Sequence, residues 1–408
     1  MQNWPNVMSN VVETFSNFRS HINRLRLIFQ LSSPVLRFID VWRHYQVYIF
    51  ALLIFTASRL VVYLGVQFGT LLPMPTGSNF WNAGPAWYHR LLRWDTGWFL
   101  TIVNNGYSYN GDPRNQTPTA FFPLYPLVSH AVKFLFGIDE FLALFLVANI
   151  ASLVVAVLLA KLFKDELGDE TALLSLSFYW FFPSSLFLSA GYSESLCLVF
   201  VLLSFILLSR EKFIFAAAMA GLAVGARAVG IAMLPVVLSE MWWKNKAPDQ
   251  YVVLKMAACG VLAASGLLGF MLYLGVEFGH PLAFITAQEA WQGKPLWDRF
   301  ASAATLVPFR RLNLMTAGWF LCALALTIWS FWRLRFALSL YALGTLLVPY
   351  LTVGISDSMN RFVIMCFPAF MCLGILCKQR WLAFVLIGIF AALLLRNSAL
   401  FSQWYWVG

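Results

Sequence analysis

Long apolar stretches fill most of this chain, and polar residues are confined to the intervals between them. From Phe50 to Leu395, apolar runs of about 20 residues recur, the length that an α-helix needs to cross a bilayer core. The alternating pattern of barrel strands is absent, and a lipid-exposed backbone must satisfy its hydrogen bonds internally. The pattern therefore predicts an all-α polytopic membrane protein.

The apolar runs and the charges between them predict about eleven transmembrane helices. A cytoplasmic amphipathic N-terminal segment, 1–44, precedes a membrane domain, 45–408. Within that domain a long first external loop covers 69–140 and a second external loop covers 276–311. The expected transmembrane helices lie near residues 45–68, 141–163, 171–190, 192–209, 213–227, 229–243, 251–275, 312–332, 336–354, 361–377 and 380–396.

Two details of this topology are choices. Residues 123–137 are apolar, but the stretch is short and begins at a proline, so we assign it to a helix lying in the outer interface. The stretch 213–243 is too long for one transmembrane helix and carries Arg227 at its centre. Two short helices that meet at the outer surface around 227–230 remove this charge from the bilayer midplane.

Composition and charge agree with a membrane protein. The chain is 60% hydrophobic and 11% charged, whereas a soluble domain has about 25% charged residues. The formal charge of +10 does not form a basic domain, so we expect no nucleic-acid partner. Instead, basic residues mark each segment that the topology places in the cytoplasm, as the positive-inside rule requires. In segment 1–44 apolar residues recur at helical spacing with arginines between them. This pattern is typical of an amphipathic helix on an anionic membrane surface.

The chemistry is concentrated in residues 93–126, a polar and aromatic interval between two apolar regions. It contains Asp95, one of 18 acidic residues in the chain, between Trp94 and Thr96. Two interpretations stay open at this point. Asp95 either caps an interfacial helix that starts at Thr96 or acts as a catalytic acid or base at the membrane surface. Tryptophans such as Trp94 and Trp98 either stack on sugar rings or belong to an interfacial aromatic belt.

Arginines at the expected outer ends of helices suggest an anionic ligand such as a phosphate. Arg227 is the first choice for a phosphate ligand and Arg361 the second. For each, a structural salt bridge, to Glu194 or Asp357, is the alternative. Arg59, in the first span, is expected to be one partner of a buried pair. The second external loop, which includes Trp291, either closes over a substrate or is simply solvated.

Four sequence blocks, in order over roughly residues 50–370, resemble the phosphatidylinositol-glycan class V (PIG-V) mannosyltransferases of the GT-C superfamily. The first and most specific joins Arg93-Trp94-Asp95 to Gly106-Tyr107 and to 120–126. The others are 182–187 with Gly191-Tyr192-Ser193-Glu194-Ser195, 221–223 with Arg227-Ala228-Val229-Gly230, and Asn360-Arg361 with Phe367-Pro368.

The resemblance implies a GT-C-like fold with the active site in the first external loop, between interfacial helices. It implies transfer of a sugar, typically mannose, from a polyprenyl- or dolichyl-phosphate donor with inversion of the anomeric centre. The expected acceptor is a lipid-linked molecule or a glycolipid. Eukaryotic relatives act on the glycosylphosphatidylinositol precursor; for this chain we expect a prokaryotic relative with another acceptor. We expect no cofactor and no metal ligands, although a need for a divalent metal stays open, and we expect a monomer among membrane lipids.

On matching positions, the resemblance implies specific roles for residues of this chain. Inverting glycosyl transfer needs one carboxylate to take the acceptor proton and positive charge to stabilise the departing phosphate. Asp95 is the expected general base, and Arg227 and Arg361 are the expected phosphate ligands. The residues expected to line the substrate are Arg93, Trp94, Tyr107, Phe122, Tyr125, Tyr192, Glu194 and Asn360.

The expected location is the inner membrane of a prokaryote, or the endoplasmic reticulum membrane in a eukaryote, with the active site on the extracytoplasmic side. Three alternatives remain: a GT-C transferase that uses another lipid-linked sugar, one that uses a protein acceptor, and a lipid or solute transporter. Transporters favour internal repeats and helices broken at the midplane. The sequence shows no convincing repeat, and its notable charges gather at one face, which favours an enzyme. The cysteines form no CxxC pair and no cluster with histidine, so neither disulfides nor a zinc site is expected.

Overall fold

The computed structural model describes residues 33–75, 84–245, 249–293, 295, 298, 314–353, 358–377 and 379–408. The greater part of the expected amphipathic segment 1–44 therefore lies outside the described residues, and so does Asp357. The chain divides into two compact units, residues 1–49 and 50–408. The second unit contains the candidate site.

The described residues form α-helices and short 3-10 helices, labelled η, and no strand. The first half of the chain contains α2 (Ser33–Gly69), η1 (Trp87–Leu91), α3 (Thr96–Asn105), η2 (Pro118–Ala120), α4 (Leu124–Phe136), α5 (Glu140–Leu167), α6 (Asp169–Phe181), η3 (Ser185–Leu188) and α7 (Glu194–Leu208). The second half contains α8 (Phe213–Ala226), η4 (Ala228–Ala232), α9 (Met233–Lys244), α10 (Gln250–Ala263), α11 (Ser265–Phe278), α12 (Ala283–Ala287), α13 (Glu289–Gln292), α15 (Leu314–Ser330), α16 (Phe336–Val353), α17 (Met359–Met365), α18 (Phe367–Leu376) and α19 (Arg380–Ser402).

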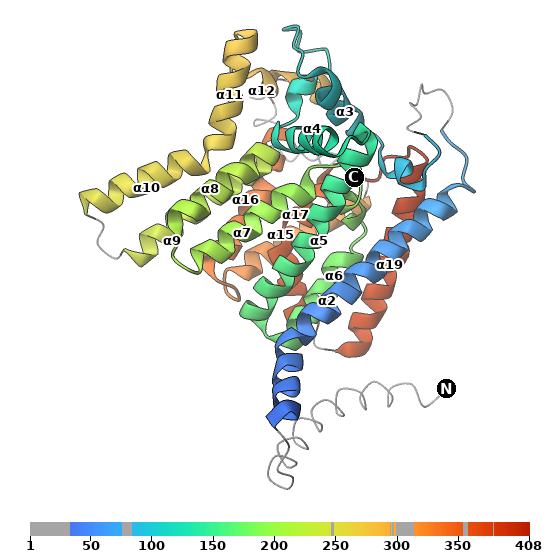
Figure 1. Cartoon of the computed structure of the whole chain (residues 1–408), viewed down its shortest axis with the longest axis vertical. Helices are drawn as coiled ribbons and strands as arrows, with labels where there is room; N and C mark the ends of the chain where they lie inside the picture. The colour runs from blue at the N-terminus through green and yellow to red at the C-terminus, as the bar shows by residue number, and fades with distance from the viewer. Residues whose placement is uncertain are drawn as a thin grey trace. The chain divides into compact units, whose positions relative to one another are not determined.

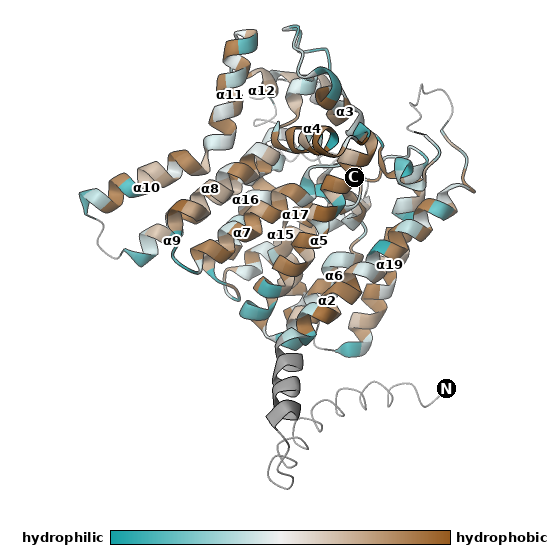
Figure 2. Cartoon of the chain, in the orientation of Figure 1, coloured by the Kyte–Doolittle hydropathy of each residue, from teal (hydrophilic) through white to brown (hydrophobic). Residues whose placement is uncertain are grey.

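Three of the described helical segments are long and apolar enough to cross a membrane: Tyr45–Gly69, α5 and α19. Two bent pairs raise the number to five if each pair counts as one broken span. These are α10 with α11, bent by 57°, and α17 with α18, bent by 74°. Eleven spans are therefore not confirmed, although α7, α8 and α15 begin and end within two residues of the expected ranges. The chain is an integral membrane protein, and the long helices are hydrophobic along most of their length (Figure 2).

Helices α3 and α4 lie at one end of α5, α7 and α8, and α4 runs across them (Figure 1). Helix α4 corresponds to the stretch 123–137 that the sequence assigns to an interfacial helix, and it packs against α3, α5 and α8. It begins directly after Pro123, whose fixed φ suits a helix start, and it ends at Gly137 in the left-handed region. The stretch between α2 and α5 therefore contributes α3 and α4, which cover one end of the bundle.

Small residues let the backbones of the bundle approach closely. Gly221 and Gly225 on α8 face the bend between α10 and α11, where a side chain at Gly266 would collide with the carbonyl oxygen of Gly221. Such glycine-lined crossings are common between membrane helices because they allow close backbone packing. The crossing fixes α8, whose end carries Arg227, against the bent pair.

Arg59 on α2 forms no ion pair with any residue that the structure describes, so the expected buried pair is not observed there. Its guanidinium donates to Ser185 O at 3.0 Å, Ser189 Oγ at 2.6 Å and Ser185 Oγ at 3.1 Å. The rings of Phe55 and Trp180 pack on it at 5.5 and 5.3 Å. The expectation was wrong because η3 turns a carbonyl and two hydroxyls toward α2, and these satisfy the guanidinium without a carboxylate.

Candidate active site

Asp95 stands at the N-terminus of α3, in a turn formed by a tryptophan in an unusual conformation. Trp94 has φ 56°, in the left-handed region that residues other than glycine rarely adopt. Asp95 itself is helical, and its side chain makes no capping hydrogen bond to α3. The capping interpretation is therefore not supported, and the carboxylate is turned toward other partners. Unusual backbone conformations of this kind gather at functional sites.

The turn at Asp95 is held by the chain segment just before α7. The hydroxyl of Tyr192 accepts a hydrogen bond from the N–H of Asp95 at 3.3 Å and donates to the carbonyl of Arg93 at 3.2 Å. The hydroxyl of Thr96 donates to Gly191 O at 3.2 Å. The ring of Tyr192 is fully buried. The backbone on both sides of Asp95 is thus fixed by residues from a second sequence block.

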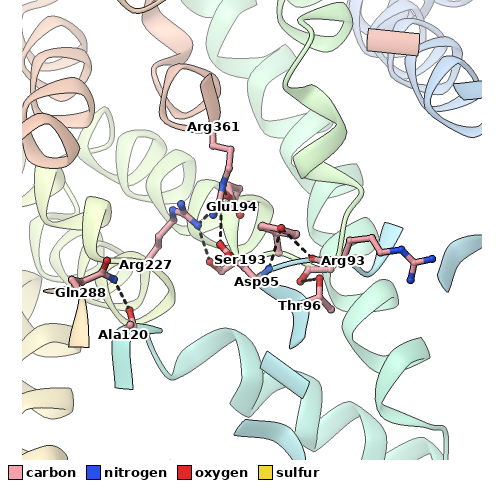
Figure 3. A network of polar contacts seen from close by, with 11 residues as sticks. Arg93, Asp95, Thr96, Ala120, Ser193, Glu194, Arg227, Gln288 and Arg361 are labelled. Atoms are coloured by element: carbon pink, nitrogen blue, oxygen red, sulfur yellow. Dashed lines mark hydrogen bonds and ion pairs between the residues drawn. The ribbon is translucent and has the colours of Figure 1, made fainter. Parts of the chain in front are cut away.

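Four charged side chains from distant parts of the chain meet beside this turn. Arg361 Nη1 lies 2.6 Å from Asp95 Oδ2, and Arg361 Nε lies 3.1 Å from Glu194 Oε1. Arg227 Nη1 lies 2.9 Å from the same oxygen of Glu194. In Figure 3 the two arginines reach Glu194 from two sides, while Arg93 points away from the group. Two carboxylates balance two guanidinium groups, so the cluster is formally neutral.

The four groups differ in their access to solvent. The Glu194 side chain is 0% exposed and Arg361 6%, whereas Arg227 is 14% and Asp95 23% exposed. Glu194 therefore acts as a buried counter-ion for the two arginines, whereas the Asp95 carboxylate is partly exposed to the cavity. Removing Glu194 would leave two guanidinium groups without their shared counter-ion, whereas removing one arginine leaves Glu194 paired with the other.

Arg227 lies at the break between α8 and η4 and retains unused hydrogen-bonding capacity. Its backbone is extended, with φ −163° and ψ 135°, and its Nη1 donates to Ser193 Oγ at 3.3 Å. The ring of Phe362 packs on its guanidinium at 5.4 Å. Within the described part of the chain, Arg227 Nε and Glu194 Oε2 are buried atoms without a hydrogen-bond partner. Buried polar atoms without a partner are rare and call for a ligand or water.

A cavity of about 750 Å³ opens beside the charged cluster. This volume is within the range of small-molecule binding sites. Asp95, Arg227 and Arg361 are its charged lining residues among those described. Its aromatic lining residues are Trp94, Trp98, Phe99, Phe121, Phe122, Phe284, Trp291, Phe362, Trp404 and Trp406.

One wall of the cavity is an aromatic cluster from three separate elements. The rings of Trp98 on α3 and Phe121 lie nearly parallel, 17° apart with centroids at 6.1 Å. Trp291 on α13 meets both edge-on, at 5.6 and 5.9 Å. Gln288, just before α13, donates to Ala120 O at the end of η2 at 3.3 Å and so joins the two segments that carry Trp291 and Phe121 (Figure 3). Aromatic faces next to amide groups suit the apolar face and the hydroxyls of a sugar.

The sequence of this region matches that of known enzymes. Residues 73–273 match the family model described as Mannosyltransferase (PIG-V). The chain belongs to this family. The matched range includes the PIG-V chain's Asp95, Glu194 and Arg227, whereas Arg361 lies beyond it.

Solved structures with a similar helical arrangement come from Archaeoglobus fulgidus. One is the crystal structure of its oligosaccharyltransferase in complex with Zn and sulfate, with a TM-score of 0.46 and 14% identity over 85% of this PIG-V chain and 52% of that chain. Another is its oligosaccharyltransferase AglB in complex with an inhibitory peptide and a dolichol-phosphate, with a TM-score of 0.45 and 13% identity over 89% and 56%. The chain spans about half the length of these two chains. No curated protein sequence matches it.

The structure brings some of the predicted site residues of the PIG-V chain to the cavity and leaves others behind it. Asp95, Arg227, Arg361, Trp94 and Phe122 line the cavity. The predicted lining residues Arg93, Tyr125, Tyr192, Glu194 and Asn360 are buried and do not line it. The salt-bridge alternative is observed for both Arg227 and Arg361, which pair with Glu194. Both arginines also border the cavity, and their role as phosphate ligands stays a prediction.

Tyr107 also lies behind the cavity wall. Its hydroxyl donates to Phe121 O at 2.8 Å, and its ring packs against Phe270 and Tyr273. Burial raises the pKa of the Tyr107 phenol well above its usual range, so the phenol stays protonated and can donate. Tyr107 therefore fixes the backbone of the aromatic wall and does not face the cavity.

The sequence analysis missed the part of the wall that lies farthest along the chain. Trp404 and Trp406 line the cavity, and so does Gln288. A possible signal was the density of tryptophan after α19, in the sequence Gln403-Trp404-Tyr405-Trp406. As for metals, no group of three His, Cys, Asp or Glu side chains that could hold an ion occurs among the residues that the structure describes.

Proposed function

We propose that this PIG-V family member transfers a mannosyl residue, with inversion, from a polyprenyl- or dolichyl-phosphate donor to a lipid-linked or glycolipid acceptor. The observation that carries the proposal is the cavity in which a partly exposed carboxylate, Asp95, lies beside two arginines, Arg227 and Arg361. A base and a cationic phosphate site are the minimum that this reaction needs. Membership of a mannosyltransferase family supports the choice of mannose.

In the proposed reaction Asp95 is the general base. The acceptor hydroxyl oxygen attacks the anomeric carbon, its proton passes to the Asp95 carboxylate, and the bond from the anomeric carbon to the phosphate oxygen breaks. The bond's electron pair leaves with the phosphate. The fixed backbone around Asp95, held by Tyr192, keeps the carboxylate at one place in the cavity, and such pre-organisation lowers the barrier.

Arg227 and Arg361 stabilise the phosphate as it departs. Both line the cavity, and Arg227 Nε has no protein partner within the described residues. Glu194 holds the two guanidinium groups side by side through a single oxygen. Arginine is well suited to this role because its planar set of donors matches phosphate oxygens.

Donor binding changes the partner of Arg361. In the structure one of its nitrogens is engaged by Asp95 at 2.6 Å. A phosphate that binds Arg361 competes with this ion pair, and the Asp95 carboxylate then becomes available to an acceptor hydroxyl. The arrangement favours binding of the donor before the acceptor.

The remaining parts of the proposal follow from the family and from the aromatic walls. Trp98, Phe121 and Trp291 contact a sugar ring, and membrane lipids surround the helices. The reaction takes place on the extracytoplasmic side of a prokaryotic inner membrane, or in the lumen of the endoplasmic reticulum in a eukaryote. We propose that a monomer suffices and that the residues of the site work without a cofactor.

Transfer of label from donor to acceptor tests the function. The full chain in proteoliposomes is supplied with polyprenyl-phosphate [³H]mannose and a lipid extract, and the labelled lipids are separated. We expect mannose to move to an acceptor lipid in the wild type and not in Asp95→Asn. Movement of the donor across the bilayer without transfer would instead indicate a transporter, and transfer from another lipid-linked sugar but not from mannose would indicate a different specificity.

A further inference from the structure

The segment after α19, residues 403–408, folds back toward the site. The N–H of Tyr405 donates to Leu400 O and the N–H of Trp404 donates to Phe401 O, both at 3.1 Å. This is the Schellman pattern, in which the residue after the cap is left-handed and usually glycine. Trp404 occupies that position with φ 66°. A tryptophan there is strained, so the surroundings must favour its ring.

The two tryptophan rings of this segment enclose Trp94. Trp404 and Trp406 lie 6.0 and 5.5 Å from Trp94, both edge-on. Trp404 also packs over the guanidinium of Arg93 at 4.8 Å, and Arg93 Nε donates to Ser402 O at 3.4 Å. The left-handed residue that precedes Asp95 is therefore packed against a second left-handed tryptophan from the far end of the sequence.

Trp406 packs on the guanidinium of Arg361 and also lines the cavity. Three rings surround this guanidinium: Tyr192 at 4.7 Å, Phe187 at 5.3 Å and Trp406 at 5.5 Å. Tyr192 and Phe187 are fully buried, whereas Trp406 lines the cavity. The Trp406 ring is therefore the member of this cage that both packs on Arg361 and faces the cavity.

The end of the segment is fixed over the same arginine. Asn360 Nδ2 donates to Gly408 O at 3.4 Å. A side chain at Gly408 would collide with the ring of Trp406 and press on Cδ of Arg361. Residues 403–408 are thus closely fitted to the site, which an interfacial aromatic belt would not require.

We propose that residues 403–408 are part of the active site and that Trp406 is a positioning residue for Arg361. The inference rests on the proposed function. The indole face holds the guanidinium plane so that Nη1 points to Asp95 and Nε to Glu194, and an arriving donor phosphate finds the cation already in place. Without the ring, the guanidinium is free to rotate into the cavity, and donor binding must restore its orientation.

Binding of farnesyl phosphate to the purified full chain in detergent tests this role. Trp406→Ala should weaken binding about ten-fold, the scale of a desolvated cation–π contact. With a labelled mannosyl donor, KM for the donor should rise by a similar factor while KM for the acceptor stays unchanged. Trp406→Phe keeps an aromatic face and should recover most of the affinity. The matched control is Trp381→Ala, at the other end of α19, where the side chain is 66% exposed.

Trp406→Leu separates positioning from simple packing. Leucine fills apolar volume but has no aromatic face, so we expect binding as weak as in the alanine variant. Wild-type affinity in a folded Trp406→Leu or Trp406→Ala protein would overturn the inference, and so would equal losses in Trp406→Phe and Trp406→Leu. If the wild type neither binds farnesyl phosphate nor transfers mannose, the proposed function itself fails.

Discussion

Arg59 and Arg361 are two arginines within the helical bundle whose surroundings differ in kind. Arg59 is satisfied by hydroxyls and a carbonyl from η3, all of them neutral, and it does not line the cavity. Arg361 is held by two carboxylates and borders the cavity. The neutral acceptors fix a helix in place, whereas a carboxylate partner next to a cavity can be exchanged for an anionic ligand. The comparison indicates that position alone does not mark a functional arginine.

The largest effect on turnover should come from changing Asp95, the carboxylate that pairs with Arg361 and has no counterpart at Arg59. Asp95→Asn keeps the size of the side chain but removes the base, so turnover should fall by about 10²-fold or more. Farnesyl phosphate should bind at least as tightly as in the wild type, because the neutral amide of this variant no longer forms an ion pair with Arg361. Single-turnover transfer and equilibrium binding measure the two quantities. Wild-type turnover in a correctly inserted variant would exclude Asp95 as the base.

Arg227→Ala should weaken donor binding by about 10- to 100-fold, the range of a lost charge-assisted hydrogen bond. Glu194 keeps Arg361 as a partner, so the fold should survive. The acceptor KM should change little, because Arg227 faces the phosphate in the proposed reaction. Arg210→Ala, an exposed position before α8, is the control. Equal losses for donor and acceptor would contradict the assignment of Arg227 to the phosphate.

Local sequence patterns were sufficient for the helices but not for the contacts between them. The apolar runs place α7 and α8 within two residues of their observed bounds, and the charge of Arg227 marks the break after α8. The number of helices that cross the membrane did not follow, because several are short or bent. The bend between α17 and α18 lies next to Pro368 in the first turn of α18, but the apolar run continues through it, so hydropathy alone does not show the break.

In the candidate site, too, the sequence indicated individual residues but not the contacts between them. Asp95, Arg227 and Arg361 could be selected from residue type and resemblance, but their mutual contacts could not. Asp95 and Arg361 are 266 positions apart in the sequence. The sequence offers Glu194 as one possible partner of each arginine, but nothing local predicts that a single oxygen of Glu194 binds both, or that Trp406 packs on Arg361. Such contacts arise only when the helices pack.

A smaller change at the same arginine is Arg361→Lys. Lysine keeps the positive charge but presents one compact ammonium group, so it cannot reach Asp95 and Glu194 in the forked geometry of arginine. Turnover and donor affinity should each fall about ten-fold, as expected for one lost charge-assisted contact. Transfer kinetics with varied donor concentration measure both. Unchanged kinetics would mean that charge alone matters at this position.

The smallest effect on catalysis should come from changing Arg59. Arg59→Met keeps an unbranched side chain of similar length but leaves the acceptors of Ser185 and Ser189 without their donor. The folded state should lose about 1–3 kcal/mol, the cost of buried groups left unpaired, which thermal unfolding in detergent can detect. The donor KM of the folded protein should stay within about two-fold of the wild type, far below the effect of a lost charge-assisted contact. Because η3 leads into Gly191 and Tyr192, a donor-affinity loss as large as that of Arg227→Ala would show that the two arginines are coupled and that the contrast between them is wrong.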